Sequence, residues 1–188
     1  MNLYLDPQSP YAYLAEARAE RVLGAPPRLQ PVALGAIMVK RGWGSWAHTE
    51  TRAEHEASLH QRVAAAGLPP LVLPADWPAQ TLAPARATAF AHRHGATRSF
   101  LRAYWALVFA QGRAAGDIST LEAAAGEAGM DPAALVDGLG DDEIKAALRD
   151  WTDAAWDAGV RGIPTLDVDG QLFFGDDQLE VAAEALRD

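Results

Sequence analysis

The spacing of apolar residues separates the beginning of the chain from a long middle part and from the last 30 residues. Residues 3–5, Leu-Tyr-Leu, form a short β-prone run that two prolines end. Residues 11–23 are rich in Ala, Leu, Glu and Arg, a composition that favours a helix. Residues 31–34, Pro-Val-Ala-Leu, follow a Pro-Pro break and predict a second strand parallel to the first. The beginning of the chain therefore predicts a β-α-β unit.

The start of the first helix is marked by Ser9 and Pro10. A serine before a proline fits an N-cap with proline at the first helical position, where the missing N–H is not needed. Gly24 is placed to end the helix. Local sequence alone thus favours a capping role for Ser9 over a catalytic one.

Residues 40–156 consist of Ala-rich segments with few β-branched runs and predict an all-helical block. The run 119–122, Ser-Thr-Leu-Glu, has the spacing of a capping box, and Gly129 is expected to stop its helix. Asp131 and Asp141 are expected to begin two further helices. The second of these is expected to bury one stripe and to end near Gly159; the stripe consists of Ile144, Leu148, Trp151, Ala155 and Trp156.

The last 30 residues return to a β pattern. Residues 165–168 and 171–174 flank Asp169-Gly170, a strong signal for a two-residue hairpin turn. Asp176 is then expected to cap a terminal helix. The apolar positions of that helix are Leu179, Val181, Ala182, Ala185 and Leu186.

The order of elements predicts an α/β protein with a thioredoxin-like fold, in which a large all-helical domain is inserted between the β-α-β and β-β-α halves. Residues 1–38 and 157–188 would form the thioredoxin-like domain, and residues 39–156 the helical insertion. A chain of 188 residues can bury a core of this size, because a domain of that length hides about 70% of the surface that its unfolded chain exposes.

Charge and composition exclude several classes of function. The net charge of -9, without any run of Lys or Arg, argues against nucleic-acid binding. No apolar run is long enough to span a membrane, and the N-terminus lacks a basic segment followed by an apolar stretch, so we expect a cytoplasmic protein. The chain has no Cys, which excludes thiol redox chemistry by this chain alone. The five His show no metal-ligand spacing, so we expect no metal and interpret them as surface or packing residues.

Two stretches resemble the kappa-class glutathione transferases and 2-hydroxychromene-2-carboxylate isomerases of the DsbA superfamily. The first, residues 6–15, Asp-Pro-Gln-Ser-Pro-Tyr-Ala-Tyr-Leu-Ala, is similar to the start of that family, whose serine is catalytic. The second, residues 159–165, Gly-Val-Arg-Gly-Ile-Pro-Thr, with 174–177, Phe-Gly-Asp-Asp, is similar to the family's cis-proline segment and glutathione contact. The resemblance implies a thioredoxin-like fold, a homodimer, and glutathione or another low-molecular-weight thiol as cofactor.

The resemblance also assigns roles to residues of this chain. Ser9, at a helix N-terminus, would stabilise the thiolate of the bound thiol. The backbone of Ile163, before the cis Pro164, would pair with a peptide-like thiol, and Asp176 and Asp177 would hold its amino group. In the isomerases of this group, the thiolate adds to a conjugated carbonyl compound, the former double bond rotates, and the sulfur is expelled.

Other interpretations stay open for several of these residues. Asp176 and Asp177 could act only as helix caps, and Tyr11 and Tyr13 are more often core or rim aromatics than acids. Trp43 and Trp46 either line a substrate pocket with Tyr11 or cover the junction between domains. The family's Thr-Gly-Asn is Arg41-Gly42-Trp43 here, and its Asp-Arg is Asp177-Gln178. We therefore also consider a non-catalytic protein that binds a peptide or a small apolar ligand.

Overall fold

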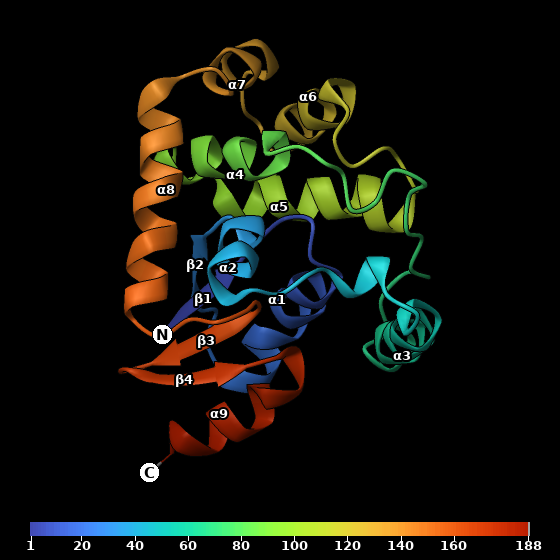
Figure 1. The fold of residues 1–188 in the computed structure, drawn as a ribbon, viewed down its shortest axis with the longest axis vertical. Coiled ribbons are helices and arrows are strands. Elements are labelled where there is room, and N and C mark those ends of the chain that lie inside the picture. The colour runs from blue at the N-terminus through green and yellow to red at the C-terminus, as the bar shows by residue number, and fades with distance from the viewer. Residues whose placement is uncertain (188) are drawn as a thin grey trace.

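A computed structural model describes residues 1–187 and joins both ends of the chain in one four-stranded sheet of order β2-β1-β3-β4 (Figure 1). The strands are β1 (Asn2–Leu5), β2 (Arg28–Pro31), β3 (Thr165–Val168) and β4 (Gln171–Phe174). β2 is parallel to β1, whereas β3 is antiparallel to β1 and to β4. The predicted hairpin is confirmed, with Asp169 and Gly170 both at positive φ in its turn. Asp188, the last residue of the predicted domain, lies outside the described residues.

Helix α1 (Pro10–Leu23) begins and ends where the sequence predicts. Ser9 Oγ accepts a hydrogen bond from the backbone N–H of Ala12 at 3.2 Å, and Pro10 is the first helical residue. Gly24 closes the helix in the left-handed conformation, with φ of 79°. These signals are local, which is why the sequence is sufficient to place them.

The second strand was predicted at residues 31–34, and this is wrong by three residues. β2 ends at Pro31, and Val32 makes one more bond, from its N–H to the carbonyl of Leu5. The next two backbone donors leave the sheet: Ala33 N–H binds Thr152 Oγ1 and Leu34 N–H binds Asp6 Oδ2, each at 2.9 Å. Helix α2 (Leu34–Arg41) therefore begins where the strand was expected to continue.

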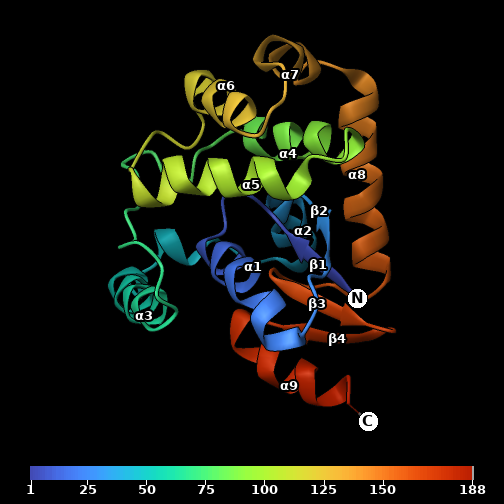
Figure 2. The ribbon, with the colours of Figure 1, turned by 180° about the vertical axis from the view of Figure 1, so that it is seen from behind.

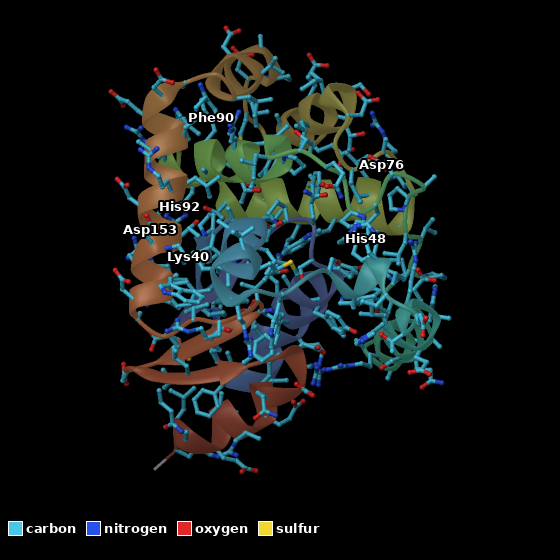
Figure 3. The ribbon with its side chains drawn as sticks, in the orientation of Figure 1. Lys40, His48, Asp76, Phe90, His92 and Asp153 are labelled. Carbon is cyan, nitrogen blue, oxygen red and sulfur yellow. The ribbon has the colours of Figure 1, made fainter. Side chains whose placement is uncertain are left out.

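Helices cover both faces of the sheet. Helices α1 and α2 lie on opposite faces, as the two opposite views show (Figures 1 and 2), and α9 (Leu179–Ala185) packs beside α1. Helix α8 (Asp142–Asp157) packs against β2 and α2, and an ion pair between Lys40 and Asp153 joins α2 to α8 (Figure 3). Of the predicted stripe on α8, Ile144, Leu148 and Ala155 are buried, but Trp151 and Trp156 are only partly buried.

The middle of the chain is helical, as predicted. Helices α4 (Ala83–Arg93), α5 (Thr97–Trp105), α6 (Ile118–Glu127) and α7 (Pro132–Gly138) pack together beyond one end of the sheet, while α3 (Arg52–Ala65) lies apart from them (Figure 1). A π-helical turn, Ala106–Ala110, extends α5. Asp131 and Asp141 cap α7 and α8 as predicted, but α6 is capped by Asp117, not by Ser119.

The α/β fold class with helices between two sheet-forming halves is confirmed. The expected boundary at residues 38/39 falls inside α2, and the one at 156/157 falls at the end of α8. One buried apolar cluster extends from Leu3 in β1 to Trp105 in α5 and Leu121 in α6, so the sheet and the helical block share a core. Among the described residues, no helix is long and apolar enough to cross a membrane.

Candidate functional site

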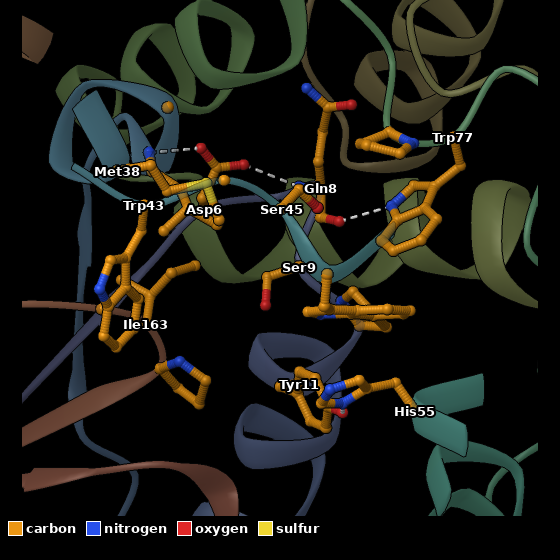
Figure 4. A pocket seen from close by; sticks show the side chains of 18 of the residues that line it. Asp6, Gln8, Ser9, Tyr11, Met38, Trp43, Ser45, His55, Trp77 and Ile163 are labelled. Carbon is orange, nitrogen blue, oxygen red and sulfur yellow. Dashed lines mark hydrogen bonds between the residues drawn. The ribbon is translucent and has the colours of Figure 1, made fainter. Parts of the chain in front are cut away.

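A cavity of about 960 Å³ opens beside the N-terminus of α1. Its wall is built by the segment before α1, by α2 and α3 with the chain between them, by the chain before α4, and by the two ends of the hairpin segment (Figure 4). All eight residues that the sequence nominates for the site lie in its lining: Ser9, Tyr11, Trp43, Trp46, Ile163, Pro164, Asp176 and Asp177. The fold thus brings residues from both ends of the chain and from the middle to one place.

Hydrogen bonds from three other parts of the chain hold the segment before α1 in place: from the start of α2, from Trp77 and from α5. The buried carboxylate of Asp6 accepts the N–H of Gln8 and the N–H of Leu34, each at 2.9 Å. Burial raises the pKa of Asp6, and these two backbone bonds oppose the rise. Trp105 Nε1 donates to the carbonyl of Pro7 at 2.8 Å, and Trp77 Nε1 donates to that of Gln8 at 2.7 Å. The backbone that carries Ser9 is therefore fixed.

Ser9 is 5% exposed, and what remains exposed faces the cavity, where its hydroxyl points toward the space between Tyr11 and Ile163 (Figure 4). Its oxygen accepts the N–H of Ala12. A hydroxyl has one proton to donate and this bond does not use it, so the proton is free for an acceptor in the cavity. No hydrogen bond within residues 1–187 engages the N–H of Tyr11, which adds a second donor at the positive end of the helix.

Ile163 and Pro164 lie across the cavity from α1, before β3, and the bond between them is cis. The side chain of Ile163 is buried. In the described part of the chain, no hydrogen bond engages the N–H or the C=O of Ile163, whereas the carbonyl of Pro164 accepts Gly175 N–H at 2.9 Å. A ligand with a peptide-like backbone could thus pair with Ile163.

The two aspartates after β4 differ sharply in what they can do. Asp176 is 1% exposed, and its carboxylate accepts Arg62 Nη2 at 2.6 Å and Arg18 Nη1 at 3.2 Å. The expected capping role of Asp176 is wrong, because its oxygens are directed at these arginines and not at helix N–H groups. The carboxylate of Asp176 is already paired with these two arginines. Of the two aspartates, Asp177 is the one that is exposed on the cavity lining and can accept a hydrogen bond from an ammonium group.

The tryptophans line the cavity without filling it. Trp43 is 52% exposed at the rim, and the guanidinium of Arg41 stacks 3.0 Å from the centre of its ring. Trp46 belongs to the wall, where its ring lies 4.9 Å from that of His55, 5.1 Å from that of Trp77 and 6.1 Å from that of Tyr11. Aromatic surface therefore faces the cavity on the α3 side.

Sequence reasoning missed the contribution of α3. His55 was interpreted as a surface or packing residue. It does pack on Trp46, but it also lines the cavity, and its Nδ1 lies 3.1 Å from Tyr11 Oη. Arg62, two helical turns further along α3, lines the same wall. Neither residue lies in a sequence motif, and the only signal is their spacing of seven residues, which places both on one face of a helix.

No group of three or more His, Asp or Glu side chains among residues 1–187 is arranged as a metal site. The features that the cavity does offer are a hydroxyl donor, the helix N–H of Tyr11, an unpaired backbone edge and aromatic surface. Such a set can donate hydrogen bonds to an anionic atom, pair with an extended backbone and contact apolar surface.

Comparison with known proteins follows this geometry. A family model described as a DSBA-like thioredoxin domain matches residues 1–187. A structure of 2-hydroxychromene-2-carboxylate isomerase is similar with a TM-score of 0.86 at 21% identity, over 99% of this chain and 93% of that chain. A probable DsbA oxidoreductase from Streptomyces coelicolor is similar with a TM-score of 0.74 at 22% identity, over 98% and 87% of the two chains.

At these identities the structural likeness shows the fold and not the activity. No curated protein matches the sequence. The family match, in contrast, covers every described residue. The chain therefore belongs to the DSBA-like thioredoxin domain family.

Proposed function

We propose that this protein is an isomerase or transferase that uses glutathione or a similar low-molecular-weight thiol. The observation that carries the proposal is an open cavity at the N-terminus of α1 in which the Ser9 hydroxyl has a proton left to donate. The bound thiol supplies a sulfur nucleophile, which this Cys-free chain lacks. The structure of 2-hydroxychromene-2-carboxylate isomerase shares this fold, and the proposal extends isomerisation from that protein to this chain.

Different residues of the chain would bind different parts of the thiol. The Ser9 hydroxyl and the N–H of Tyr11 stabilise the thiolate, because a hydroxyl donor and a helix N-terminus both favour a negative charge. Ile163 pairs with the backbone of the thiol, and Asp177 accepts its ammonium group. The rings of Trp43 and Trp46 bound the space that is left for a second substrate.

The alternative is a protein that binds a peptide or apolar ligand without catalysis. A groove filled by Trp43 or Trp46 would favour it. Trp43 instead lies at the rim and Trp46 in the wall, and the cavity between them reaches Ser9. This arrangement favours the thiol-dependent enzyme.

Calorimetry with glutathione and with cysteine tests the proposal, together with the absorbance of the bound thiolate. We expect binding at millimolar concentration or tighter, and about 10- to 100-fold weaker thiolate binding in Ser9→Ala, from the loss of one hydrogen bond to a charged group. Ser9→Gly serves as a second variant, because glycine replaces a capping serine at a loss of only a few tenths of a kcal/mol, roughly. Ser99→Ala, on the exposed side of α5, is the matched control. Absence of binding to the wild type, or unchanged thiolate binding in both Ser9 variants, would contradict the proposal.

A further inference from the structure

Tyr11 and His55 meet in the wall of the cavity although 44 positions separate them in the sequence. Tyr11 lies in the first turn of α1, two residues after Ser9, and His55 lies in the first turn of α3. Tyr11 Oη and His55 Nδ1 are 3.1 Å apart, and both residues line the cavity (Figure 4). The phenol is thus positioned beside the place where we propose that the sulfur binds.

The imidazole of His55 is held so that Nδ1 faces the phenol. Trp46 stacks on it with an angle of 25° between the rings, and the rings of Trp46 and Tyr11 meet at an angle of 69°. Within residues 1–187, no hydrogen bond engages the other ring nitrogen, Nε2. If Nδ1 carries the proton, it donates to Tyr11 Oη and leaves the phenol O–H free to point into the cavity.

Burial keeps the proton on the phenol of Tyr11. Burial raises the pKa of Tyr11. The positive charge of Arg62, whose guanidinium lies 5.6 Å from the ring centre, lowers this pKa, and the negative charges of Asp176 and Asp177 raise it. The net direction is upward, so at neutral pH the phenol is a hydrogen-bond donor and not a phenolate. A neutral donor in a partly buried wall suits an oxygen on which negative charge develops.

We propose that Tyr11 is a catalytic residue of the thiol-dependent reaction, and that its O–H stabilises the substrate oxygen that becomes negative, with His55 as the positioning residue. This inference rests on the proposed function. For a conjugated enone, a C–S bond forms at the β carbon and the π electrons move to the carbonyl oxygen, which the Tyr11 O–H holds. The single bond rotates, the electrons return, the C–S bond breaks, and the thiolate leaves. No proton or electron is consumed.

The hydrogen-bond direction can be measured without any substrate. ¹⁵N NMR of the His55 ring at pH 8.5 reports which nitrogen carries the proton, and a His55→Asn variant assigns the signal. We expect the proton on Nδ1, and we expect the Nδ1 signal to shift in Tyr11→Phe. A proton on Nε2, which would make Nδ1 the acceptor of the phenol proton, would overturn the inference.

Kinetics with glutathione or cysteine and cis-chalcone, a conjugated aryl enone, give the second test. We expect Tyr11→Phe to lower kcat about 100-fold or more while KM and the Kd for the thiol change by less than about threefold, as for loss of one donor to a developing oxyanion. His55→Asn keeps an N–H near the position of Nδ1 and should retain more of kcat than His55→Leu. Tyr13→Phe is the matched control, because the Tyr13 ring packs on Trp105 and Phe109, away from this cavity.

The outcomes separate the two proposals. Turnover that depends on Ser9 but is unchanged in Tyr11→Phe would overturn this inference and leave the proposed function standing. Equal loss of kcat in His55→Asn and His55→Leu would overturn the positioning role of His55. If the wild type neither binds nor uses a thiol, both the proposed function and this inference are overturned.

Discussion

His92, on α4, shows how the surroundings of a single side chain determine a pH dependence of stability. Its Nδ1 lies 3.1 Å from Thr97 Oγ1, and its ring centre lies 4.8 Å from that of Trp151 on α8, with an angle of 71° between the rings. Burial lowers the pKa of His92 below the usual 6.5, and the positive charge of Arg28 lowers it further. The folded protein therefore resists protonation of this ring more than the unfolded chain does.

The sign of the effect on unfolding follows from this difference. Below pH 6.5 the unfolded chain binds a proton at residue 92 that the folded chain does not, so the free energy of unfolding falls as the pH falls through that range. We expect His92→Gln to lose less stability than the wild type between pH 7.5 and 5.5, measured by urea unfolding. His60→Gln, at an exposed position on α3, is the control and should follow the wild type. A wild-type slope in His92→Gln would show that other groups cause the fall.

At the scale of single residues, the sequence predicts roles whose partners are near in the chain. Ser9, Asp131 and Asp141 cap helices as expected because each binds an N–H only two or three positions away. Asp176 has the same local pattern but binds Arg62 and Arg18, which lie 114 and 158 positions away. No pattern of neighbours reveals partners at such separations, and the same holds for Tyr11 and His55.

Helix α8 is tied to the start of α2 by one threonine. Thr152 is buried, and its Oγ1 donates to the carbonyl of Leu148 at 2.6 Å and accepts Ala33 N–H at 2.9 Å. Because Ala33 N–H bonds to Thr152 and not to a neighbouring strand, the chain leaves the sheet after β2. This long-range contact explains why a run of residues that resembles a strand becomes the beginning of a helix.

Because it also accepts the N–H of Ala33, Thr152 should contribute more to the free energy of unfolding than a helical threonine that bonds only within its own helix. We expect Thr152→Val to lower the free energy of unfolding by about 1–3 kcal/mol, because a buried backbone N–H is left without an acceptor. Thr88→Val is a close control: Thr88 is also buried in a helix and also donates to the carbonyl four residues earlier, but within residues 1–187 it accepts no bond from another element. Urea unfolding of both variants measures the difference. Equal losses would mean that the bond to Ala33 contributes nothing.

At the scale of elements, the sequence locates α1, α6, α7, α8, α9 and the hairpin, because apolar period and turn chemistry are local signals. It predicts α3, α4 and α5 only as parts of one helical block, and it does not predict α2. It does not reveal how α3 is placed. That helix is linked to its neighbours by the irregular segments around it, and it reaches the cavity through Tyr11 and Trp46. The aromatic and basic wall of the candidate site comes from this placement, which explains why His55 and Arg62 were missed while Ser9 and Pro164 were found.

The whole molecule has a core that crosses from the sheet to the helical block. Trp105 is central to it: the side chain is buried in the shared cluster, and its Nε1 donates to Pro7 in the segment that leads to Ser9. A helix of the predicted insertion thereby supports the segment of the predicted thioredoxin-like domain that carries Ser9. The two parts are separate in topology but joined in packing.

This shared core leads us to expect that the sheet and the helical block unfold together. Native-state hydrogen exchange should give the same opening free energy for the slowest amides of β1, such as Leu5, and of α6, such as Leu121, because both side chains belong to one cluster. Trp105→Phe removes the bond to Pro7 and part of a large side chain, so we expect it to lower both values equally, by about 1–3 kcal/mol. A lower opening free energy in α6 with an unchanged value in β1 would show instead that the helical block opens by itself. The sheet side of the candidate site would then stay folded while the side formed by the helical block opens.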